Sequence, residues 1–292
     1  MSKIKKAIIP IAGLATRFLP LSKVVPKEFL PLVDKPTIHY VIEEAINSGI
    51  KEVIFITNPG KGKNVLKYFQ TDSNLEKILK EREKDQFLKE LQSLKSLFKN
   101  VTFSFVPQKE QLGDGHAILQ AKNLIKRDNC AVLFPDDVID SKTPCLLQLQ
   151  KIFNTCEKPI VALKRIPKES IPHYGVIDGE PITSRLYKIK NVVEKPSQDS
   201  APSDLAIIGR YILTPEVFDS LKKVRPSKKK EIILADALRD LAQSGKIVYG
   251  YDIDGKWLDC GDKLRWLKAN LYLSLKHPQF GPELRKYYEK NH

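Results

Sequence analysis

Three features that define common classes of protein are missing from this 292-residue chain. No apolar run reaches the roughly 18–20 residues of a membrane-spanning helix, so the sequence predicts no membrane partner. Neither Gly-x-Gly-x-x-Gly nor Gly-x-x-x-x-Gly-Lys-Ser/Thr occurs, which argues against a nicotinamide-dependent dehydrogenase and against a P-loop kinase or ATPase. Gly-x-Ser-x-Gly is also missing, so nothing favours a serine hydrolase.

Cysteine is scarce as well. The four cysteines (Cys130, Cys145, Cys156 and Cys260) form no Cys-x-x-Cys pair, and the five histidines show no metal-binding spacing. Scattered cysteines and the lack of a secretion signal predict a protein of the reducing cytoplasm.

Acidic residues are outnumbered: 35 Asp and Glu stand against 49 Lys and Arg, for a net charge of +14. A positive surplus suits nucleic acid, but it equally suits small anions such as nucleotides and sugar phosphates. The cations are spread along the chain, with one dense run at 228–230, and no nucleic-acid-binding motif is present. We therefore expect phosphorylated small molecules as ligands and no nucleic acid.

The hydrophobic pattern alternates between strands and helices. An apolar strand at 7–12 is followed by a helix at 37–48 and a second strand at 51–57, which predicts a parallel crossover unit. Similar units follow, and the second half is a mixture of strands and helices. We predict an α/β fold with a Rossmann-like, mixed but mostly parallel central sheet flanked by helices. Residues 1–292 are expected to form a single domain, with 264–292 as a C-terminal helical extension.

A highly charged segment at 75–99 carries an apolar stripe among alternating Glu and Lys. This pattern predicts one amphipathic helix or a pair of helices. We expect the stripe to pack on the sheet, although a surface for a partner is the alternative.

The segment after the first strand is rich in proline and cations. The strand breaks at Gly13, where a small residue permits a tight turn, and Arg17, Lys23 and Lys27 follow. Backbone and cations arranged in this way can bind phosphate oxygens. An ordinary surface loop with lysines is the alternative that spacing alone leaves open.

Polar residues also follow two other predicted strands, at Gln108 and at Asp136 and Asp137. Ligands of α/β proteins bind at the carboxyl ends of parallel strands, so these residues and Gly13 are expected at one edge of the sheet. Paired carboxylates there are a candidate magnesium site, with helix-capping or turn aspartates as the alternative. Asp259, which precedes a glycine turn, does not by itself indicate a function.

Eight motifs together carry a resemblance to a known family. They are IPIAGLATRFLP (9–20), PKEFLPLVDKPTIHYVIEEAINSGI (26–50), LGDGHAI (112–118), LFPDDV (133–138), YGVIDG (174–179), NVVEKP (191–196), APSDLAIIGRYIL (201–213) and LDCGDKLRWLKA (258–269). In this order they resemble the bacterial UTP–glucose-1-phosphate uridylyltransferases of the sugar-nucleotidyltransferase superfamily. The charged insertion at 75–99 is also similar to that group.

The resemblance implies a reaction between UTP and glucose 1-phosphate that gives UDP-glucose and pyrophosphate with the help of Mg²⁺. Because a sugar phosphate is already an ionised nucleophile, positioning and charge neutralisation are sufficient for catalysis. The same resemblance implies a homodimer or homotetramer. Alternatives are a related enzyme with another base or sugar, and a non-catalytic regulatory relative.

The resemblance also implies roles for individual residues. Triphosphate and sugar-phosphate cations are implied at Arg17, Lys27 and Lys195. Nucleotide-binding positions are implied at Ala12, Gly13, Gln108 and Gly113, the Gln108 amide suiting the uracil edge because it can both donate and accept. Sugar-binding positions are implied at Gly175, Glu194 and Gly209, and metal ligands at Asp136 and Asp259.

The chain departs from the family pattern at several positions. Ala15 stands where the family usually has a second glycine, which is costly if the backbone there needs positive φ. Asp114 replaces an apolar residue, and the segment 225–231 replaces a glycine-rich stretch. These departures leave the rate and the sugar preference open.

Overall fold

Alternating side chains place the first strand in the middle of two hydrophobic cores. The computed structural model describes residues 4–60, 62–227 and 230–291, so Lys228 and Lys229 of the basic run lie outside the described residues. In β1 (Lys6–Pro10), Ile8 packs into one core cluster, whereas Ala7 and Ile9 pack into the other. Burial on both faces is what a central parallel strand requires.

In the described part of the chain, the main sheet has nine strands in the order β5-β4-β1-β6-β11-β8-β12-β10-β9. The strands are β1, β4 (Glu52–Thr57), β5 (Thr102–Pro107), β6 (Cys130–Leu133), β8 (Ile160–Arg165), β9 (Gly175–Pro181), β10 (Leu186–Glu194), β11 (Leu205–Leu213) and β12 (Tyr249–Asp252). Only β10 and β11 run opposite to the other seven, so the predicted mixed, mostly parallel sheet is confirmed.

The direction of the strands changes where β6 meets β11. The first four strands of the sheet (β5, β4, β1 and β6) pair with one another only in parallel, and we call them the parallel half. From β6 onward, the pairings of β11 and β10 are antiparallel, and we call β11, β8, β12, β10 and β9 the mixed half. The two halves therefore meet along one pair of strands.

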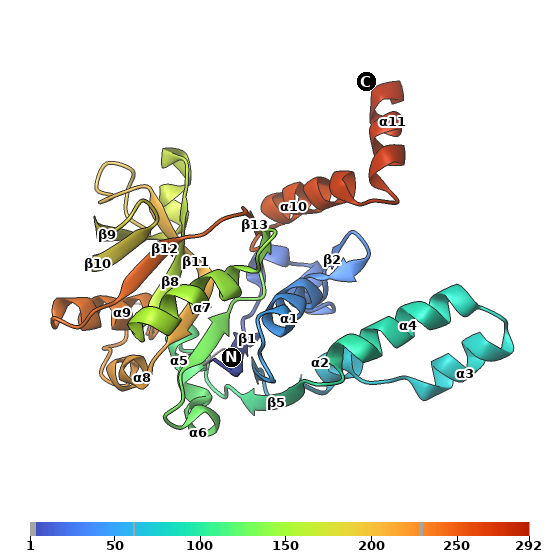
Figure 1. Cartoon of the computed structure of the whole chain (residues 1–292), viewed down its shortest axis with the longest axis horizontal. Coiled ribbons are helices and arrows are strands. Elements are labelled where there is room, and N and C mark those ends of the chain that lie inside the picture. Colours follow the sequence, from blue (N-terminus) through green and yellow to red (C-terminus); the bar gives the residue numbers. More distant parts are fainter. Residues whose placement is uncertain (1–3, 61, 228–229, 292) are drawn as a thin grey trace.

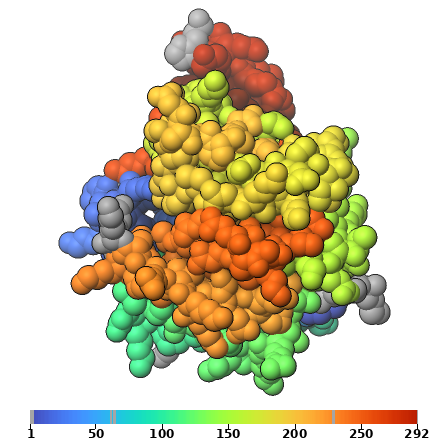
Figure 2. Space-filling model, turned by 90° about the vertical axis from the view of Figure 1, so that its left-hand side faces the viewer, coloured from blue at the N-terminus to red at the C-terminus, as the bar shows by residue number. Residues whose placement is uncertain are grey.

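Helices cover both faces of the sheet, which is the arrangement predicted from the alternation of strands and helices (Figure 1). One face carries α5 (Asp114–Gln120), α6 (Lys122–Ile125), α8 (Pro215–Leu221) and α9 (Leu234–Gln243). The other carries α1 (Thr37–Asn47), α2 (Gly62–Phe69) and α7 (Cys145–Cys156). Figure 2 shows a side of the molecule built mainly by the second half of the chain.

The charged segment forms a pair of helices, α3 (Ser73–Glu81) and α4 (Asp85–Phe98), that projects from the sheet (Figure 1). The expectation that its stripe packs on the sheet is wrong for most of its length. Phe98 is buried against Phe69 and Phe103, but Leu75 is 40% and Phe87 is 53% exposed. The two helices contact each other, and this contact takes up part of the apolar stripe.

A small antiparallel ribbon, absent from the sequence prediction, joins β7 (Asp137–Asp140) to β13 (Lys256–Asp259). Its register places Asp259 opposite Asp137. A two-residue pair, β2 (Pro31–Leu32) and β3 (Lys35–Pro36), lies in the segment before α1. The β7–β13 ribbon matters for function because it brings carboxylates from distant parts of the sequence together.

The chain continues beyond the sheet in two helices, α10 (Lys263–Lys276) and α11 (Gly281–Asn291), with α11 lying away from the main body (Figure 1). Several large apolar side chains of these helices are exposed, among them Leu264, Leu267 and Leu271. Among the described residues, no helix combines the length and the apolar character needed to cross a bilayer.

Candidate active site

The loop after β1 is a series of short turns that carries the three predicted cations Arg17, Lys23 and Lys27. It contains the 3₁₀ helices η1 (Thr16–Phe18), η2 (Leu21–Lys23) and η3 (Lys27–Phe29). Ala15 precedes η1 with φ 52° and ψ 36°, so the left-handed backbone that favours glycine is present at this departure from the family pattern. Its carbonyl accepts hydrogen bonds from Phe18 N and Ser22 Oγ, which hold the conformation.

The predicted nucleotide-binding residues line one cleft of about 380 Å³. Its lining includes Ala12, Gly13, Lys27, Gln108, Gly113 and Asp136. Gln108 is only 4% exposed, and its Nε2 donates to Gly113 O at 3.1 Å, which fixes the plane of the amide. Strands β1, β5 and β6 thus bring these side chains to one edge of the parallel half, as their positions after the strands predicted.

The segment before α9 closes the far side of this cleft. Ile232 N donates to Leu112 O at 2.7 Å, and Gly115 N donates to Ile232 O at 3.0 Å. Asp114 Oδ1 accepts from Leu234 N at 3.0 Å, so it joins the start of α9 to the start of α5. Asp114, one of the departures from the family pattern, therefore connects Leu234, three residues after the segment 225–231, to the cleft.

Two of the residues that line the cleft form an ion pair. Lys27 Nζ is 2.5 Å from Asp136 Oδ2. Burial disfavours the ammonium, but attraction to Asp136 outweighs it and raises the pKa of Lys27. Burial also disfavours the carboxylate, yet the same partner holds the pKa of Asp136 below its usual value. Both groups are therefore charged at neutral pH.

The two predicted metal ligands converge beside Gly261. A Cβ built there would lie 2.9 Å from Asp259 Oδ1, 3.4 Å from Asp136 Oδ2 and 3.7 Å from Arg17 Nη1. The backbones are joined as well, since Cys260 N donates to Asp136 O at 2.7 Å. The structure thus gathers Arg17, Lys27, Asp136 and Asp259 around one small region.

A third carboxyl group, Asp137, lies opposite Asp259 in the β7–β13 ribbon. Burial and the neighbouring charges of Asp136 and Asp259 raise the pKa of Asp137 to about 8. Among the described residues, no group of three or more His, Cys, Asp or Glu side chains forms a complete metal site. The oxygens of Asp136 and Asp259 suit a hard divalent cation, but such a cation would need further oxygens from a phosphate or from water.

The predicted sugar-binding residues Gly175 and Glu194 face each other across β9 and β10. A Cβ on Gly175 would lie 2.9 Å from Glu194 Oε2, so the missing side chain leaves space for that carboxylate. Lys195, with φ 48°, follows the strand, and its Nζ pairs with Glu194 Oε1 at 2.9 Å.

Gly209 is not next to the Glu194–Lys195 pair. On β11, it lies against the turn between β6 and β7, where a Cβ would be 2.2 Å from Asp137 Oδ2. The predicted sugar-binding position is thus adjacent to the carboxylate region, at the boundary of the two sheet halves.

Four further residues reach this region without having been singled out from the sequence. Tyr174 Oη donates to Asp259 Oδ2 at 2.6 Å, and Arg265 from α10 contacts both groups. Arg210 and Glu44 form a buried ion pair behind Asp137. Spacing gave no signal for these contacts, although all four residues lie within motifs described above.

The chain is similar to known proteins over nearly its whole length. The nucleotidyl transferase family matches residues 6–274. The UTP–glucose-1-phosphate uridylyltransferase of Staphylococcus haemolyticus (strain JCSC1435) is 43% identical over 288 residues, 98% of this chain and 98% of the relative. That of Bacillus subtilis (strain 168) is 40% identical over 292 residues, 99% of this chain and 97% of the relative.

Solved structures are similar over the same extent. A UDP-glucose pyrophosphorylase complexed with UDP-glucose has a TM-score of 0.84 at 39% identity, covering 94% of this chain and 100% of the other. A UTP-bound UGPase from Acinetobacter baumannii has a TM-score of 0.88 at 35% identity, covering 98% of both chains. The resemblance predicted from the eight motifs is therefore confirmed.

Proposed function

This chain belongs to the nucleotidyl transferase family, and we infer that it transfers the uridylyl group of UTP to glucose 1-phosphate, giving UDP-glucose and pyrophosphate. The observation that carries the inference is the Lys27–Asp136 pair in the lining of the 380 Å³ cleft. A fixed ammonium beside a carboxylate in this lining supports the binding of a triphosphate together with a divalent cation. Relatives about 40% identical over nearly their whole length have this activity in their names.

The chemistry needs cations rather than a base. An oxygen of glucose 1-phosphate attacks the α-phosphorus of UTP, a new P–O bond forms, and the bond to pyrophosphate breaks with the electron pair leaving on pyrophosphate. We propose that Lys27 and Arg17 offset the charge of the triphosphate and that Lys195 binds the sugar phosphate. Preorganised positive groups of this kind stabilise developing charge.

We propose that Gln108 and Gly113 bind the uracil edge and that Ala12 and Gly13 lie against the nucleoside. The fixed amide of Gln108 supports this proposal, because a buried amide that already donates to Gly113 O has one orientation. Glu194 and Gly175 are proposed to bind the glucose, with Gly209 at the boundary of that site.

A divalent metal is usual in this family, and we propose Mg²⁺ held by Asp136 and Asp259. When bound with the nucleotide, the cation would neutralise phosphate oxygens and polarise the α-phosphate. The carboxylates of Asp136 and Asp259, which converge beside Gly261, support a cation there. Because protein carboxylates alone do not complete a site in the described residues, we expect tight metal binding only together with UTP.

We also propose a cytoplasmic homodimer or homotetramer with residues 1–292 as one domain. The four free cysteines support a reducing compartment. The exposed apolar side chains of α10 (Leu264, Leu267 and Leu271) support association through the C-terminal helices. Sedimentation of the wild type and of Leu267→Glu tests this, since a second copy covering α10 would make the variant dissociate.

A substrate panel tests the activity. Pyrophosphate release is measured with UTP, dTTP, ATP, CTP and GTP, each with glucose 1-phosphate, galactose 1-phosphate or mannose 1-phosphate, with and without Mg²⁺. The proposal expects UTP with glucose 1-phosphate to give the highest kcat/KM. A higher value for another pair would favour a related nucleotidyltransferase, and no release with any pair would favour the non-catalytic alternative.

A further inference from the structure

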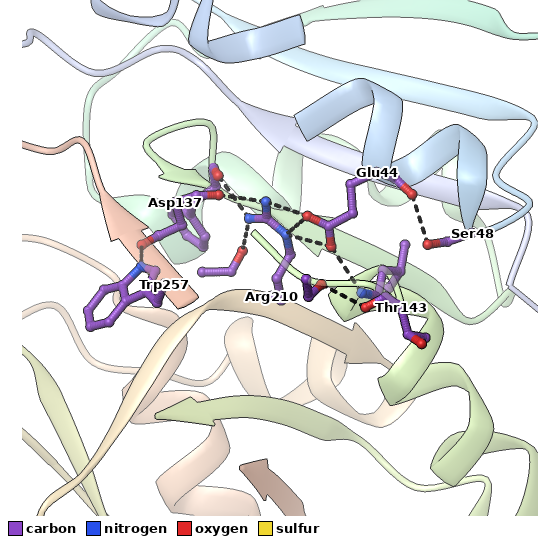
Figure 3. A network of polar contacts seen from close by, with 10 residues as sticks. Glu44, Ser48, Asp137, Thr143, Arg210 and Trp257 are labelled. Carbon is purple, nitrogen blue, oxygen red and sulfur yellow. Dashed lines mark hydrogen bonds and ion pairs between the residues drawn. The ribbon is translucent and has the colours of Figure 1, made fainter. Parts of the chain in front are cut away.

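A fully buried arginine lies directly behind the carboxylate region. Arg210, on β11, has a side chain that is 0% exposed, and Glu44 of α1 is its 9% exposed partner (Figure 3). Arg210 Nε is 3.0 and 3.1 Å from the two carboxylate oxygens of Glu44, and Nη2 donates to Oε2 at 2.9 Å. Both carboxylate oxygens of Glu44 thus accept hydrogen bonds from one edge of the guanidinium, and these bonds fix the plane of the group.

The other edge of the guanidinium donates to the turn that carries Asp136. Arg210 Nη1 donates to Phe134 O at 3.1 Å, and Nη2 donates to Asp137 O at 2.6 Å. These two carbonyls flank Pro135 and Asp136. Arg210 therefore holds both ends of a four-residue turn whose third residue is the proposed metal ligand paired with Lys27.

Glu44 has a second contact that fixes its own position. Its Oε1 accepts from Leu146 N at 2.9 Å, near the start of α7. Glu44 therefore connects α1 and α7 to the arginine, and through the arginine to the turn between β6 and β7. Figure 3 shows the whole chain of contacts from Ser48 through Glu44 and Arg210 to Asp137 and Trp257.

Stability alone is a weak reason for such a pair. Buried ion pairs lose hydration, and well-packed apolar replacements are often equally or more stable. What an apolar side chain cannot supply is a planar set of donors aimed at Phe134 O and Asp137 O. The positions of these carbonyls determine where the Asp136 carboxylate lies.

We propose that Arg210, oriented by Glu44, is a positioning residue that sets the turn 134–137 and thereby couples metal binding to UTP binding at Asp136. The proposal rests on the proposed function, because it needs Asp136 to face the metal and the triphosphate. Neither Arg210 nor Glu44 touches substrate in it.

Arg210→Lys separates this role from a structural one. Lysine keeps the charge next to Glu44 but lacks the planar donors for the two turn carbonyls. The matched control is Arg239→Lys, which alters an arginine paired with Asp236 at 2.6 Å on α9, away from the turn. Both variants are compared with the wild type by thermal unfolding and by calorimetric titration with UTP, in EDTA and in Mg²⁺.

The wild type is expected to bind UTP more tightly in Mg²⁺ than in EDTA, and the ratio of the two Kd values measures the coupling. In Arg210→Lys we expect this ratio to fall at least 5-fold while UTP affinity in EDTA changes less than 2-fold. We also expect the Mg²⁺ concentration for half-maximal turnover to rise at least 5-fold. In Arg239→Lys all three quantities should stay within 2-fold of the wild type.

A merely structural arginine would give a different result: UTP affinity would fall equally in EDTA and in Mg²⁺, and the proposal would be overturned. If Arg210→Lys does not fold, Glu44→Gln is assayed in the same way, because it keeps the shape of the partner and removes its charge. An unchanged ratio in that variant also overturns the proposal. Failure of the wild type to release pyrophosphate would instead contradict the proposed function.

Discussion

Tyr174 and Arg265 both donate hydrogen bonds to the same carboxylate oxygen, Asp259 Oδ2. The Arg265 guanidinium also lies over the Tyr174 ring, 5.2 Å from its centroid. Gly261 N donates to the second oxygen at 2.7 Å. Asp259 is therefore already supplied with positive charge and donors by its own chain, and a metal must share it with Arg265.

Replacing Arg265 should therefore strengthen metal binding. A guanidinium close to a divalent cation repels it, so we expect Arg265→Met to lower the Mg²⁺ concentration for half-maximal turnover by roughly 3- to 10-fold. Lys263→Met, two residues earlier on α10 with the same charge change, should alter it by less than 2-fold. Metal-activation curves of pyrophosphate release provide the measurement, and weaker activation in Arg265→Met would contradict the interpretation.

Loss of the Lys27 ammonium should remove most of the activity. Lys27 is the proposed cation that meets the triphosphate and also pairs with Asp136. Lys27→Met is expected to reduce kcat/KM by about 10²- to 10³-fold, the usual range for loss of a preorganised charge. Lys23, although predicted with Lys27 as a phosphate-binding cation, is exposed and does not line the cleft, so Lys23→Met should leave kcat/KM within about 2-fold.

The glucose end should respond separately from the nucleotide end. Glu194→Gln keeps the side chain next to Gly175 but removes its charge. We expect KM for glucose 1-phosphate to rise about 10-fold, because hydrogen bonds to a charged acceptor are stronger, while KM for UTP stays within about 2-fold. The control is Glu180→Gln, an exposed residue of β9 paired with Lys190. Equal increases in both KM values would rule out a role specific to the sugar.

Ala15 should be a site of stabilisation. Its φ of 52° is unfavourable for a residue with a Cβ by about 1 kcal/mol. Ala15→Gly removes this strain, but glycine has greater conformational freedom in the unfolded chain, which offsets part of the gain. We therefore expect the free energy of unfolding to increase by about 0.5 kcal/mol. Ala12→Gly, which removes a methyl that is 2% exposed, should act in the opposite direction. Urea denaturation distinguishes the two, and a destabilised Ala15→Gly would contradict the argument.

Asp114 should make stability depend on pH. Burial raises the pKa of Asp114 to about 6, although the backbone amides of Leu234 and Gly115 oppose the change. Its folded-state pKa is above the ordinary 3.8, so its contribution to stability is full below about pH 4 and is lost as the pH rises through about 6. Between about pH 4 and pH 6, the free energy of unfolding of the wild type should therefore fall by up to about 1.4 kcal/mol per pH unit relative to that of Asp114→Asn.

Urea denaturation of both proteins at pH 4, 5, 6 and 7 measures this difference. A constant difference across the series would mean that Asp114 keeps its ordinary pKa in the fold.

The regular elements were largely predictable because their signals are local. The helix expected at 37–48 is α1 (Thr37–Asn47), and the strand expected at 51–57 is β4 (Glu52–Thr57), so both lie within one residue of their predicted bounds. The cleft residues were also predictable, since Gly13, Gln108 and Asp136 each follow a parallel strand.

Contacts between distant residues account for what was missed. The β7–β13 ribbon consists of two four-residue strands whose partners are more than a hundred positions apart, so neither strand has a pattern long enough to recognise. The Arg210–Glu44 pair spans 166 positions, and a charged residue in an apolar segment gives no sign of its partner. The projection of α3 and α4 was missed because an amphipathic stripe does not specify which surface covers it.

The boundary between β6 and β11 has a consequence for how selectivity can change. The residues proposed to bind the base belong to the parallel half, whereas those proposed to bind the sugar belong to the mixed half. Mutations in the parallel half can therefore change the preference for the nucleotide without changing the preference for the sugar. Protein engineers could recombine base and sugar preferences from different relatives by exchanging the segments on either side of this boundary.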